Sequence, residues 1–377
     1  MSESADPELY LGMISGTSVD NIDAALVDLS GEQPVLVASH DHPWPAELRD
    51  AIFATRVLGD DELDQLDALD TAIADAFADA AMTCLDHAGV AASSVTAIGS
   101  HGQTIRHRPD GPAAFSLQLG NAGRIAARTG IDVVADFRSA DIDAGGQGAP
   151  MGPAFHQAVF QHEQIDRVIV NIGGIGNITV LPADPHSPVT GFDTGPGNNL
   201  MDAWIERHRG ERYDADGRFA ASGRSDVKLL AELLTDPYFE LAPPKSTGFE
   251  LFNLAWLEPH ITGDRKPEDV QSTLCDLTAT SIVRDIHRYA AATTEIYVCG
   301  GGAHNTELMS RLQRLTRAKV DSTDALGVPP DWVEAMTFAW LARQHLKQLP
   351  GNIPTVTGAR DARVLGRLST GTGTGRA

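Results

Sequence analysis

The sequence predicts an α/β fold of two lobes, each a mixed sheet covered by helices. Two observations support this prediction. Each half of the 377-residue chain opens with three short β-like runs, and the turn between the first two is rich in Gly, Ser or Thr. Helical stretches then alternate with further β-like runs. Because the halves share an architecture without sharing sequence, we expect two facing lobes with a cleft between them.

The predicted elements of the first half follow the order β-β-β-α-β-β-α-β. The long helix is expected because Leu66, Leu69, Ile73 and Phe77 recur at helical spacing opposite a row of acidic residues. Alternating apolar runs bounded by turn residues predict the strands. The strands are expected at 9–14, 22–29, 34–42, 95–100, 115–119 and 131–137, and the helices at about 60–87 and 121–128.

The second half repeats three opening strands before its helices. Strands are expected at 167–172, 177–181, 189–192 and 295–299, and helices at 198–208, 269–291, 304–316 and 331–346. The segment 210–244 is predicted to be loops plus a short helix, and the low-complexity tail 369–377 is predicted to be frayed. The expected lobes are therefore residues 1–137 and 138–377.

Composition narrows the class of protein. A net charge of −22 argues against a nucleic-acid or anionic-membrane partner, because an acidic surface repels phosphate groups. The three cysteines lack the paired spacing of a zinc site or disulfide framework, which favours a reducing compartment. Neither a signal peptide nor a run of 18 apolar residues is found, so a cytoplasmic protein is expected.

Two glycine-rich turns occupy equivalent places in the two halves. Gly16, Thr17 and Ser18 follow the first strand, and Gly173 and Gly174 follow the first strand of the second half. Turn amides and hydroxyls form a concave set of donors that suits phosphate oxygens. A plain hairpin is the simpler explanation of each turn alone, but their recurrence at equivalent places favours phosphate binding.

The block "GFDTGPGN" carries a candidate general base. Asp193 is expected just after a strand, and Asn198 is expected to cap the following helix. A carboxylate beside a helix N-terminus can face a phosphate-bound substrate, although an Asp that stabilises a turn would leave the same pattern.

Three further polar segments lack the spacing of known motifs. "CGGG" is not a dinucleotide fingerprint, and "PPKSTG" lacks the glycines of a P-loop. His101, Gln103 and His107 follow a strand without a third ligand at zinc-like spacing, so a polar binding wall or a structural histidine is favoured over a metal site.

Taken in order, the polar blocks resemble the anhydro-N-acetylmuramic acid kinases of bacterial cell-wall recycling. They span nearly the whole chain, and their joint occurrence is highly specific. The blocks are "SGTSVDNID", "IGSHGQTIRH", "GIDVVADFR", "AGGQGAP", "NIGGIGN", "GFDTGPGN", "LMDAW", "PKSTG", "VCGGGAHN" and "EAMTFAWLA".

This resemblance implies the actin, Hsp70 and sugar-kinase fold, in which two β-β-β-α-β-α-β-α halves clamp ATP. It also implies a reaction in which ATP, with Mg²⁺, phosphorylates O6 of 1,6-anhydro-N-acetylmuramic acid while water opens the anhydro ring. The product is N-acetylmuramic acid 6-phosphate. A small sugar is then the partner, and a homodimer is the common state of the family.

The resemblance also assigns roles to individual residues. Asp193 matches the catalytic aspartate that takes a proton from the attacking water, and Glu334 matches an acid that contacts the sugar. His101, Gln103 and Gln147 are weaker candidates for the sugar pocket. The predicted ATP-binding residues are Gly16, Thr17, Ser18, Val19, Asp20, Asn21, Ile22, Asp23, Asn171, Gly173, Gly174, Gly197, Asn198, Gly300, Gly301 and Gly302.

Three positions depart from the family pattern, and they leave alternatives open. Asn21 stands where the family usually has Gly, Gly176 where Ala is common and Phe249 where Arg is usual. Asn tolerates left-handed backbone angles, so Asn21 is expected to keep the turn, with ATP affinity as the property in question. Two other hypotheses are a kinase of another sugar or polyol, and a module that binds nucleotide without catalysis.

Overall fold

The computed structural model describes residues 6–16, 18–55 and 62–371, and the chain divides into two compact units. The first unit comprises Met1–Phe155 and Trp332–Ala377, and the second comprises His156–Asp331. This division differs from the predicted boundary after residue 137. The reason is that the C-terminal segment returns to the first unit, where helix α12 (Val333–Leu346) packs on strands β1 and β4.

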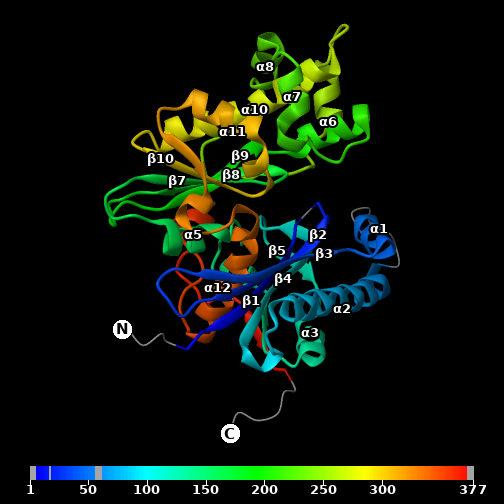
Figure 1. The fold of residues 1–377 in the computed structure, drawn as a ribbon, viewed down its shortest axis with the longest axis vertical. Coiled ribbons are helices and arrows are strands. Elements are labelled where there is room, and N and C mark those ends of the chain that lie inside the picture. Colours follow the sequence, from blue (N-terminus) through cyan, green and yellow to red (C-terminus); the bar gives the residue numbers. More distant parts are fainter. Residues whose placement is uncertain (1–5, 17, 56–61, 372–377) are drawn as a thin grey trace. The chain divides into compact units, whose positions relative to one another are not determined.

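The sheet of the first unit starts with an antiparallel meander, as predicted. Strand order in the described residues is β3-β2-β1-β4-β6-β12, and β5 pairs with β4 off this path (Figure 1). Strand β4 runs parallel to β1 and to β6. The strands are β1 (Leu9–Ser15), β2 (Asn21–Asp28), β3 (Val35–Pro43), β4 (Val95–Arg108), β5 (Phe115–Leu119), β6 (Val133–Ala135) and β12 (Arg367–Ser369).

Helices α2 and α12 cover opposite faces of this sheet. Leu11 and Met13 of β1 join the core cluster that contains Phe77 of α2. Gly12 points to the other face, since successive side chains of a strand alternate, and a Cβ there would collide with the Ala335 carbonyl oxygen of α12. Helix α2 spans Glu62–Ala88. The other helices of this unit are α1 (Ala46–Ala54), α3 (Ala122–Thr129), α4 (Ser139–Asp143) and α13 (Pro354–Thr357). Helix α5 (Gly152–Phe160) crosses the boundary between the two units.

The second unit repeats the strand order of the first. Its sheet runs β9-β8-β7-β10-β11, again an antiparallel meander followed by parallel strands on the far side of the first strand. The prediction of a duplicated α/β fold is therefore confirmed. The strands are β7 (Arg167–Ile172), β8 (Ile175–Leu181), β9 (Thr190–Pro196), β10 (Glu295–Cys299) and β11 (Lys319–Ser322).

Helix α10 (Pro267–Tyr289) lies at the centre of the second unit's core. Leu274, Leu277 and Ile282 of this helix are buried against β9, β8 and the neighbouring helices. Those helices are α6 (Asn199–Arg209), α7 (Arg218–Ser222), α8 (Val227–Leu233) and α11 (Thr306–Leu315), with the short α9 (Leu254–Leu257) packed on α6. Within the described residues, no helix combines the length and apolar character needed to cross a bilayer.

Several elements differ from the sequence-based expectation, and pairing explains most of them. Strand β4 continues to Arg108 because its second part forms a hairpin with β5. Strand β9 continues through Asp193 to Pro196 because a register shift lets it stay paired with β8. Helix α1 and strand β11 were not predicted, and two α-helices, α7 and α8, replace the single short helix expected in 210–244.

Candidate active site

The turn between β1 and β2 is held from inside the first unit. The Val19 amide donates to the Gly16 carbonyl oxygen at 3.1 Å, and the Gln103 side-chain amide of β4 donates to the same oxygen at 3.3 Å. A Cβ on Gly16 would find its nearest neighbour, Ser18 Oγ, at 3.7 Å, so a ligand has room to approach the backbone. Thr17 lies outside the described residues.

Among the described residues of this turn, the left-handed one is Val19 and not Asn21. Val19 has φ 54° and a buried side chain, whereas Asn21 is the first residue of β2 and pairs with Pro43. A β-branched residue rarely adopts positive φ, so the turn stores backbone strain at Val19. Arg49 braces it by donating from Nε to the Val19 carbonyl at 3.0 Å, and Asp20 Oδ1 lies 3.8 Å from Arg49 Nη2.

Four predicted sugar-pocket residues, His101, Gln103, Gln147 and Glu334, all belong to the first unit. Arg138, which the sequence did not single out, links two of them. It donates from Nε and Nη2 to His101 Nε2 at 3.1 and 2.9 Å, and the negative charge of Glu334 stabilises the positive charge of Arg138. Burial lowers the pKa of Arg138 to about 10, and the Glu334 and Asp141 carboxylates oppose that lowering.

His101 is neutral in this arrangement. Its Nε2 accepts from Arg138, so its Nδ1 carries the proton and donates to the Gly102 carbonyl at 3.0 Å. Burial and the Arg138 charge keep the pKa of His101 well below its usual value. Both ring nitrogens are thus used inside the protein, and His101 holds Arg138. Gln103, in contrast, keeps a buried Oε1 without a hydrogen-bond partner among the described residues.

Gln147 is placed beside the same arginine by its neighbour in sequence. The Gly148 carbonyl accepts from Arg138 Nη1 at 2.7 Å, and the Gly148 amide donates to Asp141 Oδ2 at 2.7 Å. The Gln147 amide donates to the Thr357 carbonyl at 2.8 Å. The buried Asp141 therefore ties the "AGGQGAP" segment to α13.

Asp193 lies within β9 and not after it, and three groups hold it. The Thr247 amide donates to Asp193 Oδ2 at 3.0 Å, the Asp193 amide donates to the Lys245 carbonyl at 3.2 Å, and the Tyr238 hydroxyl donates to the Asp193 carbonyl at 2.7 Å. Burial raises the pKa of Asp193 to about 6. The Thr247 hydrogen bond and the Lys245 charge oppose that rise, whereas the Glu250 charge adds to it.

Lys245, Thr247 and Tyr238 contact Asp193 but are not among the site residues that the sequence predicts. The block "PKSTG" resembles the end of a P-loop without its glycines. Its sequence gives no sign of contact with Asp193, which lies about fifty positions earlier. The resemblance of this block to the family pattern was the one available signal.

The second glycine turn is joined to helix α6. The Gly197 and Asn199 amides donate to the Gly174 carbonyl at 2.9 and 3.1 Å, and the Asn198 amide donates to the Gly173 carbonyl at 2.8 Å. Asn198 stands at the N-cap position but makes no cap hydrogen bond, because its side-chain amide donates to the Ile172 carbonyl at 3.2 Å. The predicted N-cap position of Asn198 is therefore confirmed, but its side chain does not cap the helix.

The third glycine segment meets the same turn at the carboxyl ends of two parallel strands. Asn171, the residue before the end of β7, pairs with Cys299 of β10, and a Cβ on Gly300 would lie 2.5 Å from Asn171 Oδ1. A Cβ on Gly302 would lie 2.5 Å from Ile172. Parallel strands of α/β sheets place ligand sites at their carboxyl ends. The predicted nucleotide-side residues of the second unit thus form one cluster.

Phe249 covers the second glycine turn. A Cβ on Gly174 would lie 2.6 Å from Phe249 Cζ, and the Phe249 side chain is 36% exposed. An apolar ring therefore stands over this turn where the family usually has arginine. At Gly176, a Cβ would approach Thr194 Oγ1 to 3.1 Å, so this glycine leaves room for the Thr194 hydroxyl, which donates to the Gly176 carbonyl.

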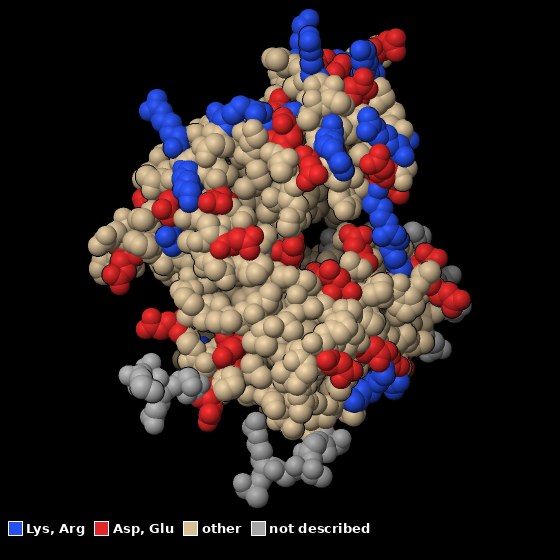
Figure 2. All heavy atoms as spheres, in the orientation of Figure 1, with Lys and Arg blue, Asp and Glu red and all other residues tan. Residues whose placement is uncertain are grey.

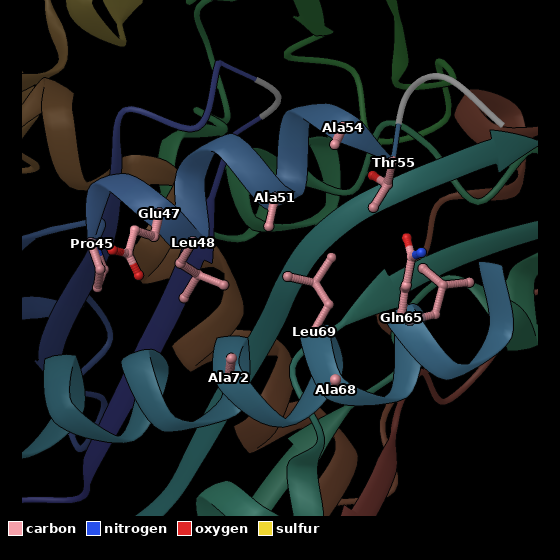
Figure 3. Close-up of a pocket in the computed structure, with 11 residues that line it drawn as sticks. Pro45, Glu47, Leu48, Ala51, Ala54, Thr55, Gln65, Ala68, Leu69 and Ala72 are labelled. Carbon is pink, nitrogen blue, oxygen red and sulfur yellow. The ribbon is translucent and has the colours of Figure 1, made fainter. Parts of the chain in front are cut away.

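An apolar cavity of about 540 Å³ lies between α1 and α2, and no predicted site residue is among the residues that line it. Figure 3 shows Leu48 and Ala51 of α1 facing Leu69 and Ala72 of α2 across it. Its polar lining consists of Glu47, Thr55 and Gln65, and the Glu47 carboxylate would repel phosphate. The cavity therefore does not suit a nucleotide.

On one face of the molecule, charged side chains are not gathered around one feature. On the face drawn in Figure 2, acidic side chains are spread over both units with basic side chains between them. A net charge of −22 that is spread in this way keeps a protein soluble through repulsion between its copies.

Comparison with known proteins gives matches over almost the whole chain. The family model "Anhydro-N-acetylmuramic acid kinase" matches residues 8–371. Proteins of that name from Shewanella sp. (strain MR-7) and Nitrosospira multiformis are 52% and 51% identical to this chain, cover 95% of it, and are themselves covered over 97% and 98% of their lengths. A ROK family glucokinase from Streptomyces griseus, solved with glucose and AMPPNP, aligns over 89% of this chain and 99% of its own, with 15% identity and a TM-score of 0.42.

Proposed function

The chain belongs to the anhydro-N-acetylmuramic acid kinase family, and we propose that its catalytic base is Asp193. Members of this family phosphorylate 1,6-anhydro-N-acetylmuramic acid in cell-wall recycling, and this protein is an ATP-dependent kinase of that class. The sugar leaves as N-acetylmuramic acid 6-phosphate, and ATP leaves as ADP.

The environment of Asp193 is the observation that carries the proposal. Thr247 fixes Oδ2, while Oδ1 accepts no hydrogen bond from the described residues and is left for a water molecule. With a pKa of about 6, the carboxylate is mostly ionised at pH 7 yet basic enough to accept a proton. This match between pKa and operating pH is what a general base requires.

The proposed step couples ring opening to phosphoryl transfer. Asp193 takes a proton from water, and the water oxygen bonds to the anomeric carbon. The bond from that carbon to O6 breaks, and O6 keeps its electron pair and attacks the γ-phosphorus. The bond from the γ-phosphorus to the ADP oxygen then breaks. The base thus acts on water, whereas in a kinase of an ordinary sugar it would act on a hydroxyl group.

The hairpin of β1 and β2 is proposed to hold the ATP phosphates. Its open approach at Gly16 supports this role, and the Asp20 side chain, 63% exposed, offers a carboxylate. Mg²⁺ usually binds through one or two carboxylates together with phosphate oxygens, so Asp20 fits an ion carried in with ATP. When bound, that ion neutralises charge on the phosphoryl group.

The sugar-binding role of the cluster around Arg138 stays a proposal. Gln103 supports it, because its unpartnered Oε1 can accept a hydrogen bond from a sugar hydroxyl. Glu334 supports it too, because it is exposed at the start of α12 beside Arg138. His101 is proposed to act through Arg138.

We also propose a homodimer and a cytoplasmic location. The family resemblance supports the dimer, and the three buried cysteine thiols, Cys84, Cys275 and Cys299, are compatible with a reducing compartment. Sedimentation of the purified protein and fractionation of cells test the two points separately.

The decisive experiment replaces Asp193 by Asn, which removes the base and nearly preserves its shape. Release of ADP in the presence of Mg-ATP and the anhydro sugar should fall about 10²- to 10⁴-fold, since a positioned base contributes that much. Nucleotide affinity, measured by calorimetry, should stay within about twofold. Formation of N-acetylmuramic acid 6-phosphate at the wild-type rate in D193N would place the base elsewhere.

A further inference from the structure

We propose that Lys245 is a positioning residue for Asp193 and that its buried ammonium sets the pH range in which the Asp193 carboxylate works. The inference rests on the proposed role of Asp193 as the base. Lys245 lies in the segment 243–250, between the turn at Pro237–Glu240 and helix α9. Its side chain is only 1% exposed, which is unusual for lysine and calls for a specific partner.

That partner is Asp285 of helix α10. Lys245 Nζ lies 2.8 Å from Asp285 Oδ2, and the Asp285 side chain is itself 5% exposed. The rings of Tyr238 and Phe192 flank the ammonium, with centroids 5.0 and 5.6 Å from Nζ. Aromatic faces attract a cation and exclude water from it. The charge of Lys245 is therefore poorly screened, and its field reaches neighbouring carboxylates more strongly than a surface lysine's would.

The backbone of the same residue holds Asp193 in place. The Lys245 carbonyl accepts from the Asp193 amide, and two residues later the Thr247 amide donates to Asp193 Oδ2. Tyr238, whose ring contacts the ammonium, donates its hydroxyl to the Asp193 carbonyl. The ion pair with α10 thus anchors the segment that fixes both the backbone and the carboxylate of the base.

The charged and titratable groups around Asp193 change its pKa in opposite directions. Burial raises its pKa, and Glu250, from the same segment as Lys245, adds to the rise, while the Lys245 charge opposes it. Tyr238 stays protonated because burial and the Asp193 charge raise its pKa. On α10, burial raises the pKa of Asp285, and Lys245, Arg284 and Arg288 oppose that rise. Lys245 is the cation among these groups that acts directly on Asp193.

The test is the pH dependence of kcat/KM in Lys245→Met, which keeps the length of the side chain and removes its charge. The midpoint of the acid limb should move up by about one pH unit, so that kcat/KM falls about fivefold at pH 6 and hardly at all at pH 8. Lys228→Met, at an exposed lysine of α8, serves as the matched control and should leave the profile unchanged.

Asp285→Asn probes the same pair from the other side. The Lys245 ammonium then remains without its counter-charge and stabilises the Asp193 carboxylate more strongly. The midpoint of the acid limb should therefore move below that of the wild type. If Lys245→Met fails to fold, this variant decides the question, and an unmoved midpoint in it overturns the proposal. If Lys245 had a purely structural role, its replacement would lower kcat by the same factor at every pH. The temperature of unfolding would then change, but the midpoint of the acid limb would stay at the wild-type value.

The two levels of inference fail in different ways. Turnover that survives in Asp193→Asn removes the premise that Asp193 is the base. If Asp193→Asn is inactive while Lys245→Met folds with an unmoved acid limb, the base stands and the role of Lys245 is refuted.

Discussion

At the scale of single residues, the turn between β1 and β2 shows that Asn21, a departure from the family pattern, does not carry the left-handed backbone of the turn. Asn21 stands where the family usually has glycine, and the sequence alone suggests that this position needs a left-handed backbone. The structure places the left-handed backbone at Val19, whose buried side chain and Arg49 contact hold it there. Asn21 opens strand β2, where any residue fits the backbone.

Replacing Asn21 by Gly should therefore change stability and leave ATP binding alone. Glycine in a strand has more freedom to lose on folding, so the free energy of unfolding should drop by about 0.5–1 kcal/mol. The KM for ATP should stay within about twofold of the wild-type value. A clearly lower KM for ATP in N21G would mean that position 21 limits nucleotide affinity after all.

At the scale of elements, the contact between β1, β4 and α12 depends on two glycines. A Cβ on Gly12 would collide with the Ala335 carbonyl, and one on Gly99 with the Phe338 carbonyl. These obstacles are helix backbone, which cannot move aside as a flexible side chain can. The close approach lets α12 bring Glu334 near Arg138 of the same unit.

Gly12→Ala should destabilise the first unit by about 1–3 kcal/mol or more, because overpacking forces α12 away from the sheet. Urea denaturation measures this loss. Gly31→Ala is the matched control, since a Cβ at Gly31 meets nothing closer than 3.5 Å, and its midpoint should match that of the wild type. Equal midpoints for G12A and G31A would show that α12 tolerates the shift.

At the scale of the whole molecule, each unit contains a buried neutral histidine. His101 lies in the first unit, and His156 in the second, where it forms a 2.8 Å hydrogen bond with Thr179. Burial lowers the pKa of His156 to about 3. Because the unfolded chain takes up a proton near pH 6.5 and the folded one does not, this stability is complete above pH 6.5 and is lost as pH falls toward 3.

The free energy of unfolding should consequently fall between pH 7 and pH 5, with His156 contributing up to about 2 kcal/mol of that loss. Asp193 opposes the trend, because its raised pKa favours the folded state as it protonates. Comparing wild type with His156→Gln cancels this opposing effect, and H156Q should show a shallower pH dependence. His186→Gln, at an exposed histidine, should keep the wild-type slope.

The sequence by itself determined the duplicated α/β fold, the glycine turns and the family. Periodic apolar runs, turn residues and ordered blocks are local signals, and each can be interpreted within a short window. The roles assigned to Asp193 and to the hairpin came from these blocks together with the family resemblance.

Tertiary structure alone decided how the candidate site is held. The contacts that hold it join residues that are distant in sequence. They are the hydrogen bonds of Asp193 with Thr247 and Tyr238, the ion pair of Lys245 with Asp285, and the hydrogen bond from Arg138 to His101. It also decided that residues 332–377 belong with the first unit. Burial sets the strength of these contacts, and burial is a property of the packed chain that no short stretch of sequence contains.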